Sequence, residues 1–232
     1  MKNLKKQKIK GLRVRLLRCN HTVPGMLNGN PVATSKRKVA ECLSNFDSFV
    51  NFYKTHAQAV VVSVRWTSKM YPVAGVLEDA SFDNQQGGVE YHKNPSSNLA
   101  LTDAGEWSTN GKWKKQAVWT FLGKLIAAQK QVFVVYPVPE VGWDLPLYNF
   151  ATYLQTGDVH RDVSTSHALY KSRNKFILET LDDQRLDAAV RIRPEEYLCE
   201  VDWKPFYYDS NHLSSEGAKP ITYAIGRAIA AR

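Results

Sequence analysis

Apolar and polar residues alternate along the chain in two kinds of segment. Short, continuous apolar runs are separated by longer segments in which apolar residues recur every three or four positions. A continuous apolar run is typical of a strand buried on both faces of a parallel sheet. The sequence therefore predicts strands at 11–19, 59–66, 131–140, 188–194 and 205–209, of which "AVVVSVRW" (59–66) is the clearest.

Segments with helical periodicity follow these strands. Helices are predicted at about 35–56, 112–129, 166–184 and 215–231. Strands that alternate with helices predict an α/β fold, with a mainly parallel sheet covered by helices on both faces. The chain of 232 residues has no internal repeat and no linker, so it is expected to form a single domain, 1–232.

Three stretches between these elements look irregular, at 21–34, 67–110 and 141–166. An insert as long as 67–110 is uncommon unless it covers a site or is mobile. In open parallel sheets, sites form beyond the carboxyl ends of the strands. The strand ends at Arg65 and Trp66, at 137–140, and at Asp209 with His212 are therefore expected to converge on one site.

Composition and charge narrow the possible functions. Hydrophobic residues make up 44% of the chain and charged residues 23%, which is a globular balance. The net charge is +9, but the first 18 residues contain eight cations and no acid, so the remainder is close to neutral. Residues 1–10 therefore form a basic tail, and nucleic-acid binding is a minor alternative that predicts affinity falling steeply with salt.

Several other classes of protein lack support in the sequence. No apolar run approaches the roughly 18 residues needed to cross a bilayer, and no signal peptide is recognisable. No spacing typical of a zinc site or a phosphate-binding loop occurs, so neither a metal nor a cofactor is expected. The cysteines Cys19, Cys42 and Cys199 are either three buried thiols or, in an oxidising compartment, a Cys19–Cys42 pair with Cys199 left over.

The segment "FYYDSNHLSSEGA", residues 206–218, contains the candidate catalytic residues. It presents Asp209 and His212 three positions apart, just before the last predicted helix. A histidine can take a proton from a nucleophile near neutral pH, and a carboxylate can hold it in the required tautomer. The alternative for so short a pattern is an ordinary capped turn in which nothing reacts.

This segment resembles the last block of the SGNH hydrolase superfamily. It is most similar to the SGNH domain at the C-terminus of bacterial membrane acyltransferase-3 proteins, which O-acylate envelope polysaccharides. The matching residues are Tyr208, Asp209, His212, Leu213, Ser214, Gly217 and Ala218. The Arg65–Trp66 strand end, the Pro-x-Pro step within 131–140 and the early loop after Cys19 agree in order, so the resemblance covers about 11–230.

The resemblance implies a three-layer α/β/α, flavodoxin-like fold and a serine-dependent acyltransferase or esterase. It implies that Asp209 and His212 are the catalytic acid and base, that Arg65 and Trp66 take part in substrate binding, and that Cys42 pairs with Cys19. It further implies acyl transfer of the O-acetylation type to a cell-envelope glycan. The partners would be an acyl donor and a membrane acyltransferase domain, at the periplasmic face of the inner membrane.

The nucleophile of the family is missing from the sequence. No Gly-Asp-Ser occurs, and the single Gly-Asp, Gly157–Asp158, is followed by Val. Ser63, inside a predicted strand, and Ser68 both lack the turn that exposes a nucleophile. We interpret 1–10 as the end of a helix whose preceding strand and serine lie upstream of Met1, so this chain is expected to be inactive alone. The alternative is a non-catalytic carbohydrate-binding or scaffold domain that has lost the serine.

Overall fold

The structure, a computed structural model, describes most of the chain between Met26 and Ala231. The strand predicted at 11–19, the basic tail, Cys19 and Asp209 lie outside the described residues, as does the side chain of Cys42. The described residues are 26–28, 36–70, 81–83, 89–91, 98–104, 106–108, 110–128, 131–141, 145–157, 165–199, 206–208 and 212–231.

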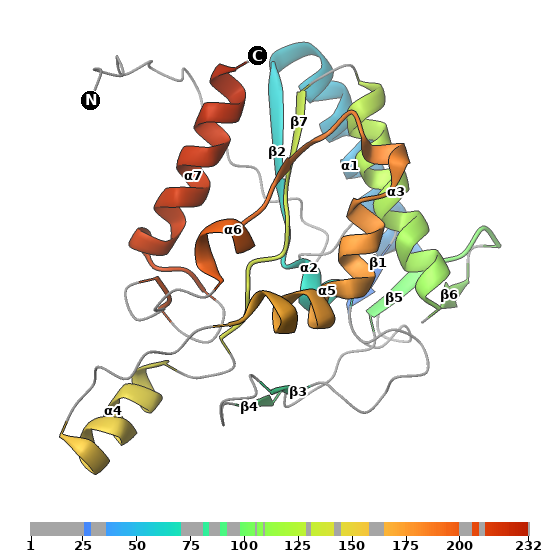
Figure 1. Ribbon diagram of the computed structural model, residues 1–232. Helices are drawn as coiled ribbons and strands as arrows, with labels where there is room; N and C mark the ends of the chain where they lie inside the picture. Colours follow the sequence, from blue (N-terminus) through green and yellow to red (C-terminus); the bar gives the residue numbers. More distant parts are fainter. Residues whose placement is uncertain are drawn as a thin grey trace.

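A parallel sheet of three strands lies at the centre of the described fold (Figure 1). Its strands are β2 (Ala59–Ser63), β7 (Gln131–Val135) and β8 (Val190–Ile192), in the order β2-β7-β8. Both neighbouring pairs are parallel. The predicted α/β fold with a parallel sheet is therefore confirmed.

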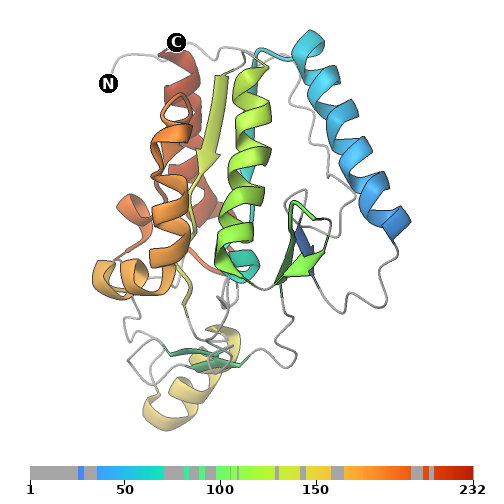
Figure 2. The same ribbon diagram turned by 90° about the vertical axis from the view of Figure 1, so that its right-hand side faces the viewer.

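Helices cover both faces of this sheet (Figures 1 and 2). On one face lie α1 (Lys36–His56), α3 (Gly111–Ala127) and α5 (His167–Leu181), and on the other lies α7 (Ser215–Ala230). All four predicted helices are thus present, with ends within a few residues of those expected. Three of them begin at a capping side chain that accepts a backbone N–H bond: Asn110, Ser166 and Ser214.

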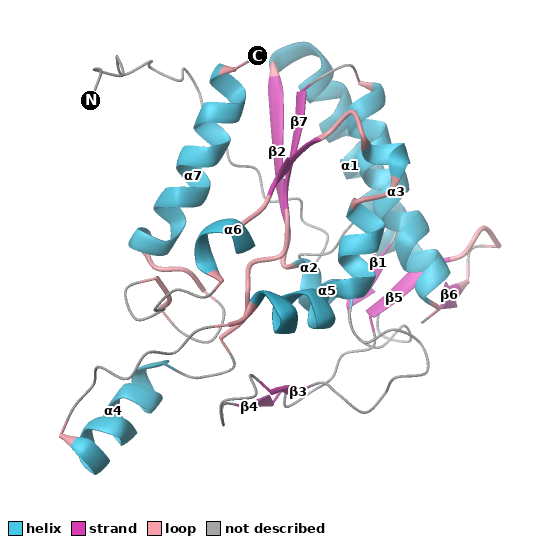
Figure 3. Cartoon of the chain, in the orientation of Figure 1, coloured by secondary structure: helices cyan, strands magenta, loops and turns pink. Residues whose placement is uncertain are grey.

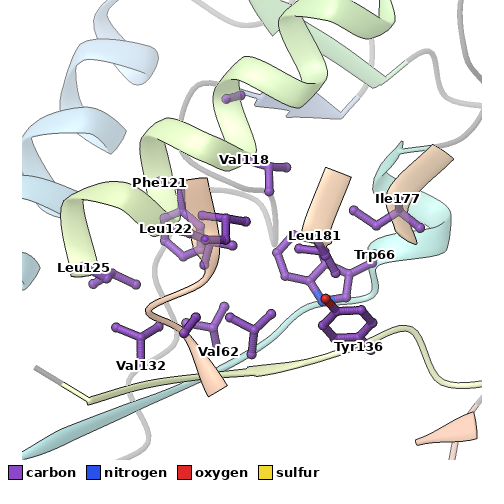
Figure 4. Packing of buried hydrophobic residues seen from close by; sticks show 14 of the residues in the cluster. Val62, Trp66, Val118, Phe121, Leu122, Leu125, Val132, Tyr136, Ile177 and Leu181 are labelled. Atoms are coloured by element: carbon purple, nitrogen blue, oxygen red, sulfur yellow. The ribbon is translucent and has the colours of Figure 1, made fainter. Parts of the chain in front are cut away.

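The alternation of side chains along the strands produces two cores. Val60, Val62, Val132 and Val134 point to the α1–α3–α5 side and pack with Leu122, among others (Figure 4). On the opposite face, Phe133, Val135 and Ile192 pack against Ile221 and Ala224 of α7. The sheet is therefore the middle of three layers.

Three predicted strands are shorter than the apolar runs that predicted them. The run at 59–66 leaves the sheet after Ser63, and Trp66 begins a short helix, α2 (Trp66–Met70). The run at 131–140 ends as a strand at Val135, because Pro137 and Pro139 have no N–H to donate to a ladder. The third run, at 188–194, forms β8 over its middle residues alone.

Two stretches predicted to be irregular contain short strands (Figure 3). β1 (Met26–Asn28), β5 (Asn98–Leu101) and β6 (Trp107–Ser108) form an antiparallel sheet, and β3 (Ser81–Asp83) pairs with β4 (Val89–Tyr91). Strands of two to four residues are too short for a period of two to stand out in the sequence. The short helices η2 (Gln184–Leu186) and α6 (Glu195–Leu198) were also missed, because three or four residues are too few to show a helical period.

The third stretch, 141–166, was wrongly predicted to lack structure, since it contains α4 (Leu145–Thr156). Both helix-end signals were present: Pro146 lies in the first turn, and Gly157 follows the last with a φ of 71°. α4 projects beyond the ends of the sheet strands (Figure 1). Helical periodicity normally implies that the large apolar side chains face the core. In α4 they do not, since four of them are between 56% and 67% exposed: Leu147, Phe150, Tyr153 and Leu154.

The strand predicted at 205–209 is absent from the part of it that the structure describes. Tyr207 forms an isolated antiparallel bridge with Leu213 instead of joining the central sheet. Beside this bridge, the backbone N–H of Tyr208 donates to the carbonyl of His212 at 2.7 Å. The apolar run is therefore part of a turn that stands next to the sheet.

A buried lysine in α3 makes the stability of the fold depend on pH. Lys114 is 1% exposed, and burial lowers the pKa of its ammonium group to about 8. Because the unfolded chain keeps an ordinary lysine pKa near 10.4, it binds more protons than the folded chain between these two values. The contribution of Lys114 to the free energy of unfolding is therefore least favourable below pH 8, and improves by about 2 kcal/mol as the pH rises from 7 to 10.

We expect Lys114→Met to remove this improvement. The variant should melt at a higher temperature than the wild type at pH 7. This difference in melting temperature should shrink towards pH 10. Melting curves at matched ionic strength over this range test the prediction. Lys54→Met, at an exposed position of α1, is the matched control and should show no such trend. A difference that is constant with pH would contradict the role given to Lys114.

Candidate active site

The turn that contains His212 is fixed by its own backbone. The bridge between Tyr207 and Leu213 is extended on one side by the N–H of Tyr208, which donates to the carbonyl of His212, and on the other by the N–H of Ser214, which donates to the carbonyl of Phe206 at 2.9 Å. His212 is exposed at the end of this turn. Its imidazole is therefore accessible to a substrate from solvent.

The residues after His212 join the turn to the helix behind it. The hydroxyl of Ser214 accepts a bond from the N–H of Gly217 at 3.2 Å and so caps α7. A Cβ atom at Gly217 would lie 2.1 Å from the carbonyl oxygen of Phe206. The first turn of α7 can therefore approach the backbone of the His212 turn only because residue 217 has no side chain.

A buried tyrosine holds the same turn against the end of β7. The hydroxyl of Tyr207 donates to the carbonyl of Pro139 at 2.7 Å, and its ring is 5% exposed. Burial raises the pKa of the Tyr207 phenol well above its ordinary value, with smaller contributions from Cys199 and Glu140. The phenol therefore remains a neutral donor at physiological pH, and the bond to Pro139 persists.

Trp66 and Arg65 lie at the exit of β2, as predicted, but in different environments. Trp66 is 1% exposed, and its indole N–H donates to the carbonyl of Val135 at 2.7 Å (Figure 4). Arg65, one residue earlier, has a side chain that is 42% exposed. The structure thus places the Trp66 ring in the core and Arg65 at the surface, and for both residues a part in substrate binding stays a prediction.

Glu140 joins the exit of β7 to two other elements. Its carboxylate is 5% exposed, and one oxygen accepts a hydrogen bond from the Nε of Arg173 in α5. The other oxygen lies 3.9 Å from Nη2 of Arg65, and the hydroxyl of Thr165 donates to the backbone carbonyl of Glu140 at 2.7 Å. The contact of Arg65 with Glu140 thus joins the exits of β2 and β7, and the bond from Tyr207 to Pro139 joins the segment next to His212 to the residues after β7.

A second network supports the ends of β7 and β8. The hydroxyl of Tyr136 donates to Asp182 at 2.9 Å, and Arg193 donates to the same carboxylate at 2.7 Å. The hydroxyl of Tyr170 donates to the carbonyl of Pro137 at 3.0 Å and lies 3.3 Å from Glu195. Burial, followed by the neighbouring carboxylate, raises the pKa of both phenols, so these bonds also persist at neutral pH.

Sequence reasoning missed three residues of this arrangement: Tyr207, Arg173 and Thr165. Tyr207 stood inside the quoted segment but was assigned to a strand. Arg173 and Thr165 gave no signal, because each makes its contact with a residue at least 25 positions away in the chain.

The structure describes some of the remaining predicted residues and not others. Asp209 and Cys19 are outside the described residues, so the acid of the pair and the Cys19–Cys42 disulfide stay predictions. Cys199 is buried. Ser63, expected inside a buried strand, is exposed at the end of β2. The described residues contain no group of three or more His, Cys, Asp or Glu that could hold a metal ion.

Comparisons with known proteins identify the family of the chain. The family model of the SGNH domain that is fused to AT3 (acyltransferase-3) domains matches residues 8–227. Comparisons with curated proteins and with solved structures gave no significant match. Among the helices that the structure describes, none is long and apolar enough to span a membrane. Since the family model matches nearly the whole chain, this protein belongs to the family of SGNH domains fused to AT3 domains.

Proposed function

We propose that this chain is the acyl-transfer domain of an O-acyltransferase, which moves an acyl group of the acetyl type onto a cell-envelope glycan. The observation that supports this most directly is His212, exposed on a turn that is fixed to the exit of β7 by Tyr207 and to α7 by Ser214. In this proposal 1–232 act as one domain beside a membrane acyltransferase domain, at the periplasmic face of the inner membrane.

The proposed chemistry gives His212 the role of general base. Its imidazole takes the proton of a serine as the serine attacks the acyl donor, and gives this proton to the leaving group as the bond between acyl and donor breaks. It then takes the proton of the glycan hydroxyl that attacks the acyl-serine, and returns a proton to the serine oxygen as the acyl–serine bond breaks. Asp209, three residues earlier, would accept the N–H of the imidazole and hold its tautomer. The backbone bonds on either side of His212 suit this role, because a base must lie within hydrogen-bond reach of the proton it removes.

The serine comes, in this proposal, from a segment outside the printed sequence, which contains no Gly-Asp-Ser. The described part of the chain offers a place for such a segment. Among the described strands β2 pairs with β7 alone, and Val61 on β2 is 38% exposed, whereas Val60 and Val62 are each 6% exposed. A further strand beside β2 would pair with this edge, and the strand predicted at 11–19, whose place is not described, is a candidate for it as well as the proposed segment.

The test is His212→Ala, introduced into the protein as its native host makes it. Loss of the base should lower acyl transfer at least about 100-fold, because general base catalysis contributes at least that much. The measurement is the amount of ester-linked acetate that mild alkali releases from the envelope glycan, at equal protein level. His56→Ala is the matched control, since His56 is an exposed histidine at the end of α1 and should leave transfer unchanged. Unchanged acetate in the His212 variant would contradict the proposal.

A non-catalytic glycan-binding or scaffold domain is the second candidate, and the missing Gly-Asp-Ser favours it. It predicts that the host protein contains no such peptide and that His212→Ala leaves glycan acylation unchanged. Saturable glycan binding without turnover would be its positive sign. The two candidates therefore give opposite results in the same His212→Ala experiment.

A further inference from the structure

An antiparallel backbone pairing places Tyr208 beside His212. Tyr207 bridges to Leu213, and the N–H of Tyr208 donates to the carbonyl of His212 at 2.7 Å, so Tyr208 and His212 lie directly opposite each other. Successive side chains in such a pairing point to opposite faces, and directly opposite residues share a face, with their Cβ atoms about 4.5–5.5 Å apart. The Tyr208 ring and the His212 imidazole therefore leave the backbone on the same face.

The burial of these side chains agrees with the alternation. On one face, Tyr207 is 5% exposed, and Leu213 packs against the same hydrophobic core, on the α7 side of the sheet. On the other face, His212 is exposed and Tyr208 is 75% exposed, more than any other large apolar side chain among the described residues. The protein thus presents an aromatic ring to solvent next to its candidate base.

The backbone beneath the Tyr208 ring is held in place. A single exposed aromatic ring is ordinary, because much of any protein surface is apolar. Here, however, the preceding residue, Tyr207, donates to the carbonyl of Pro139 at 2.7 Å, and the N–H of Tyr208 itself is bonded to His212. A tyrosine on a fixed backbone has only two side-chain torsions to order on binding, so it offers contact area with little loss of conformational entropy.

A sugar ring matches this surface in shape and polarity. Carbon-bound hydrogens cover much of each face of a pyranose, while its hydroxyls project mainly from the rim. The face of a tyrosine ring is apolar and its hydroxyl is at the far edge, so a pyranose can stack on it at a van der Waals distance of about 3.5–4.0 Å. A pyranose stacked on Tyr208 would direct rim hydroxyls towards the neighbouring His212 imidazole.

We propose that Tyr208 is a specificity-determining residue on which the acceptor pyranose of the glycan stacks, so that a rim hydroxyl lies within reach of His212. The contact involves no charged group, so it recognises the face of the sugar ring rather than an acidic substituent. The proposal rests on the function proposed above, because that function makes His212 the base that activates the accepting hydroxyl. The alternative is an exposed tyrosine that touches no substrate.

The experiment measures glycan binding by the protein purified from its native host, without an acyl donor, so that no transfer occurs. The probe is the envelope polysaccharide of the same host, freed of its esters with mild alkali and immobilised for surface plasmon resonance. Tyr208→Ala should weaken binding about 10-fold, as expected for an aromatic residue at the centre of a binding site. Tyr208→Phe keeps the ring and should bind as the wild type does. Tyr223→Ala is the matched control, because Tyr223 is 55% exposed on α7, and it should leave binding unchanged.

Melting temperatures of these variants should match that of the wild type, since the substituted side chains are exposed. If Tyr208→Ala does not fold, Tyr208→Gln repeats the test with a longer side chain that also lacks the ring. Wild-type binding by the variant without the ring would overturn the stacking role. So would equal losses in Tyr208→Phe and Tyr208→Ala, or a wild-type protein that does not bind the polysaccharide.

His212→Ala separates this role from the proposed function. It should bind the polysaccharide as the wild type does but lose acyl transfer, whereas Tyr208→Ala should weaken binding and reduce transfer. Transfer that survives His212→Ala, with binding that depends on Tyr208, would reject the acyltransferase and retain the stacking contact. Transfer that depends on His212, with binding that does not depend on Tyr208, would retain the enzyme and reject the stacking contact.

Discussion

Gly217→Ala is expected to destabilise the protein by about 3 kcal/mol or more, at the upper end of the cost of overpacking. The new methyl group would lie 2.1 Å from the carbonyl oxygen of Phe206, and that oxygen already accepts the N–H of Ser214. Both contacts involve backbone rather than a flexible side chain, so either the first turn of α7 or the turn that contains His212 must move. The same shift would displace His212 and reduce the acyl transfer that we propose for this chain.

The control for Gly217→Ala lies in the same helix. A Cβ at Gly226 would meet no atom within 4 Å, so Gly226→Ala should stabilise α7 by up to about 1 kcal/mol through helix propensity alone. Urea denaturation of the two variants measures both effects, and they should have opposite signs. Equal free energies of unfolding for the two variants would show that the close approach of α7 to Phe206 does not exist in the folded protein.

Trp66→Ala is expected to lower the free energy of unfolding by about 3–5 kcal/mol, the usual cost of removing a large buried aromatic ring. The ring is 1% exposed and lies among Ile177, Leu181 and Tyr136 (Figure 4). Trp66→Phe should cost less, about 1–2 kcal/mol, because it keeps most of the apolar contact but loses the hydrogen bond to Val135. Guanidinium denaturation of both variants measures the two contributions.

The same variants test the substrate-binding prediction for Trp66. If the ring serves the core alone, Trp66→Phe should bind the envelope glycan as the wild type does. If the ring contacts the glycan, Trp66→Phe should lose affinity under conditions in which the variant is still folded. Tyr223→Ala is the control for stability, since Tyr223 is 55% exposed on α7 and a surface substitution of this kind changes stability by less than about 0.5 kcal/mol.

The sequence by itself determined the elements whose signals are local. Helical periodicity located α1, α3, α5 and α7, and β-branched apolar runs located β2, β7 and β8, because these patterns depend on residues only a few positions apart. The block from Tyr208 to Ala218 identified the family for the same reason. His212, the capping Ser214 and the close-packed Gly217 lie in one short segment, where their mutual spacing is determined by the backbone turn itself.

Only the tertiary structure decided which distant residues meet and which apolar side chains are buried. The contact of Arg173 with Glu140 spans 33 positions, and the bond from Tyr207 to Pro139 spans 68, so neither leaves a pattern in the sequence. The same limit applies to α4, whose helical spacing is regular although its large side chains face solvent. Periodicity shows that a helix has an apolar face, but what covers that face depends on the packing of the whole chain, which no local pattern contains.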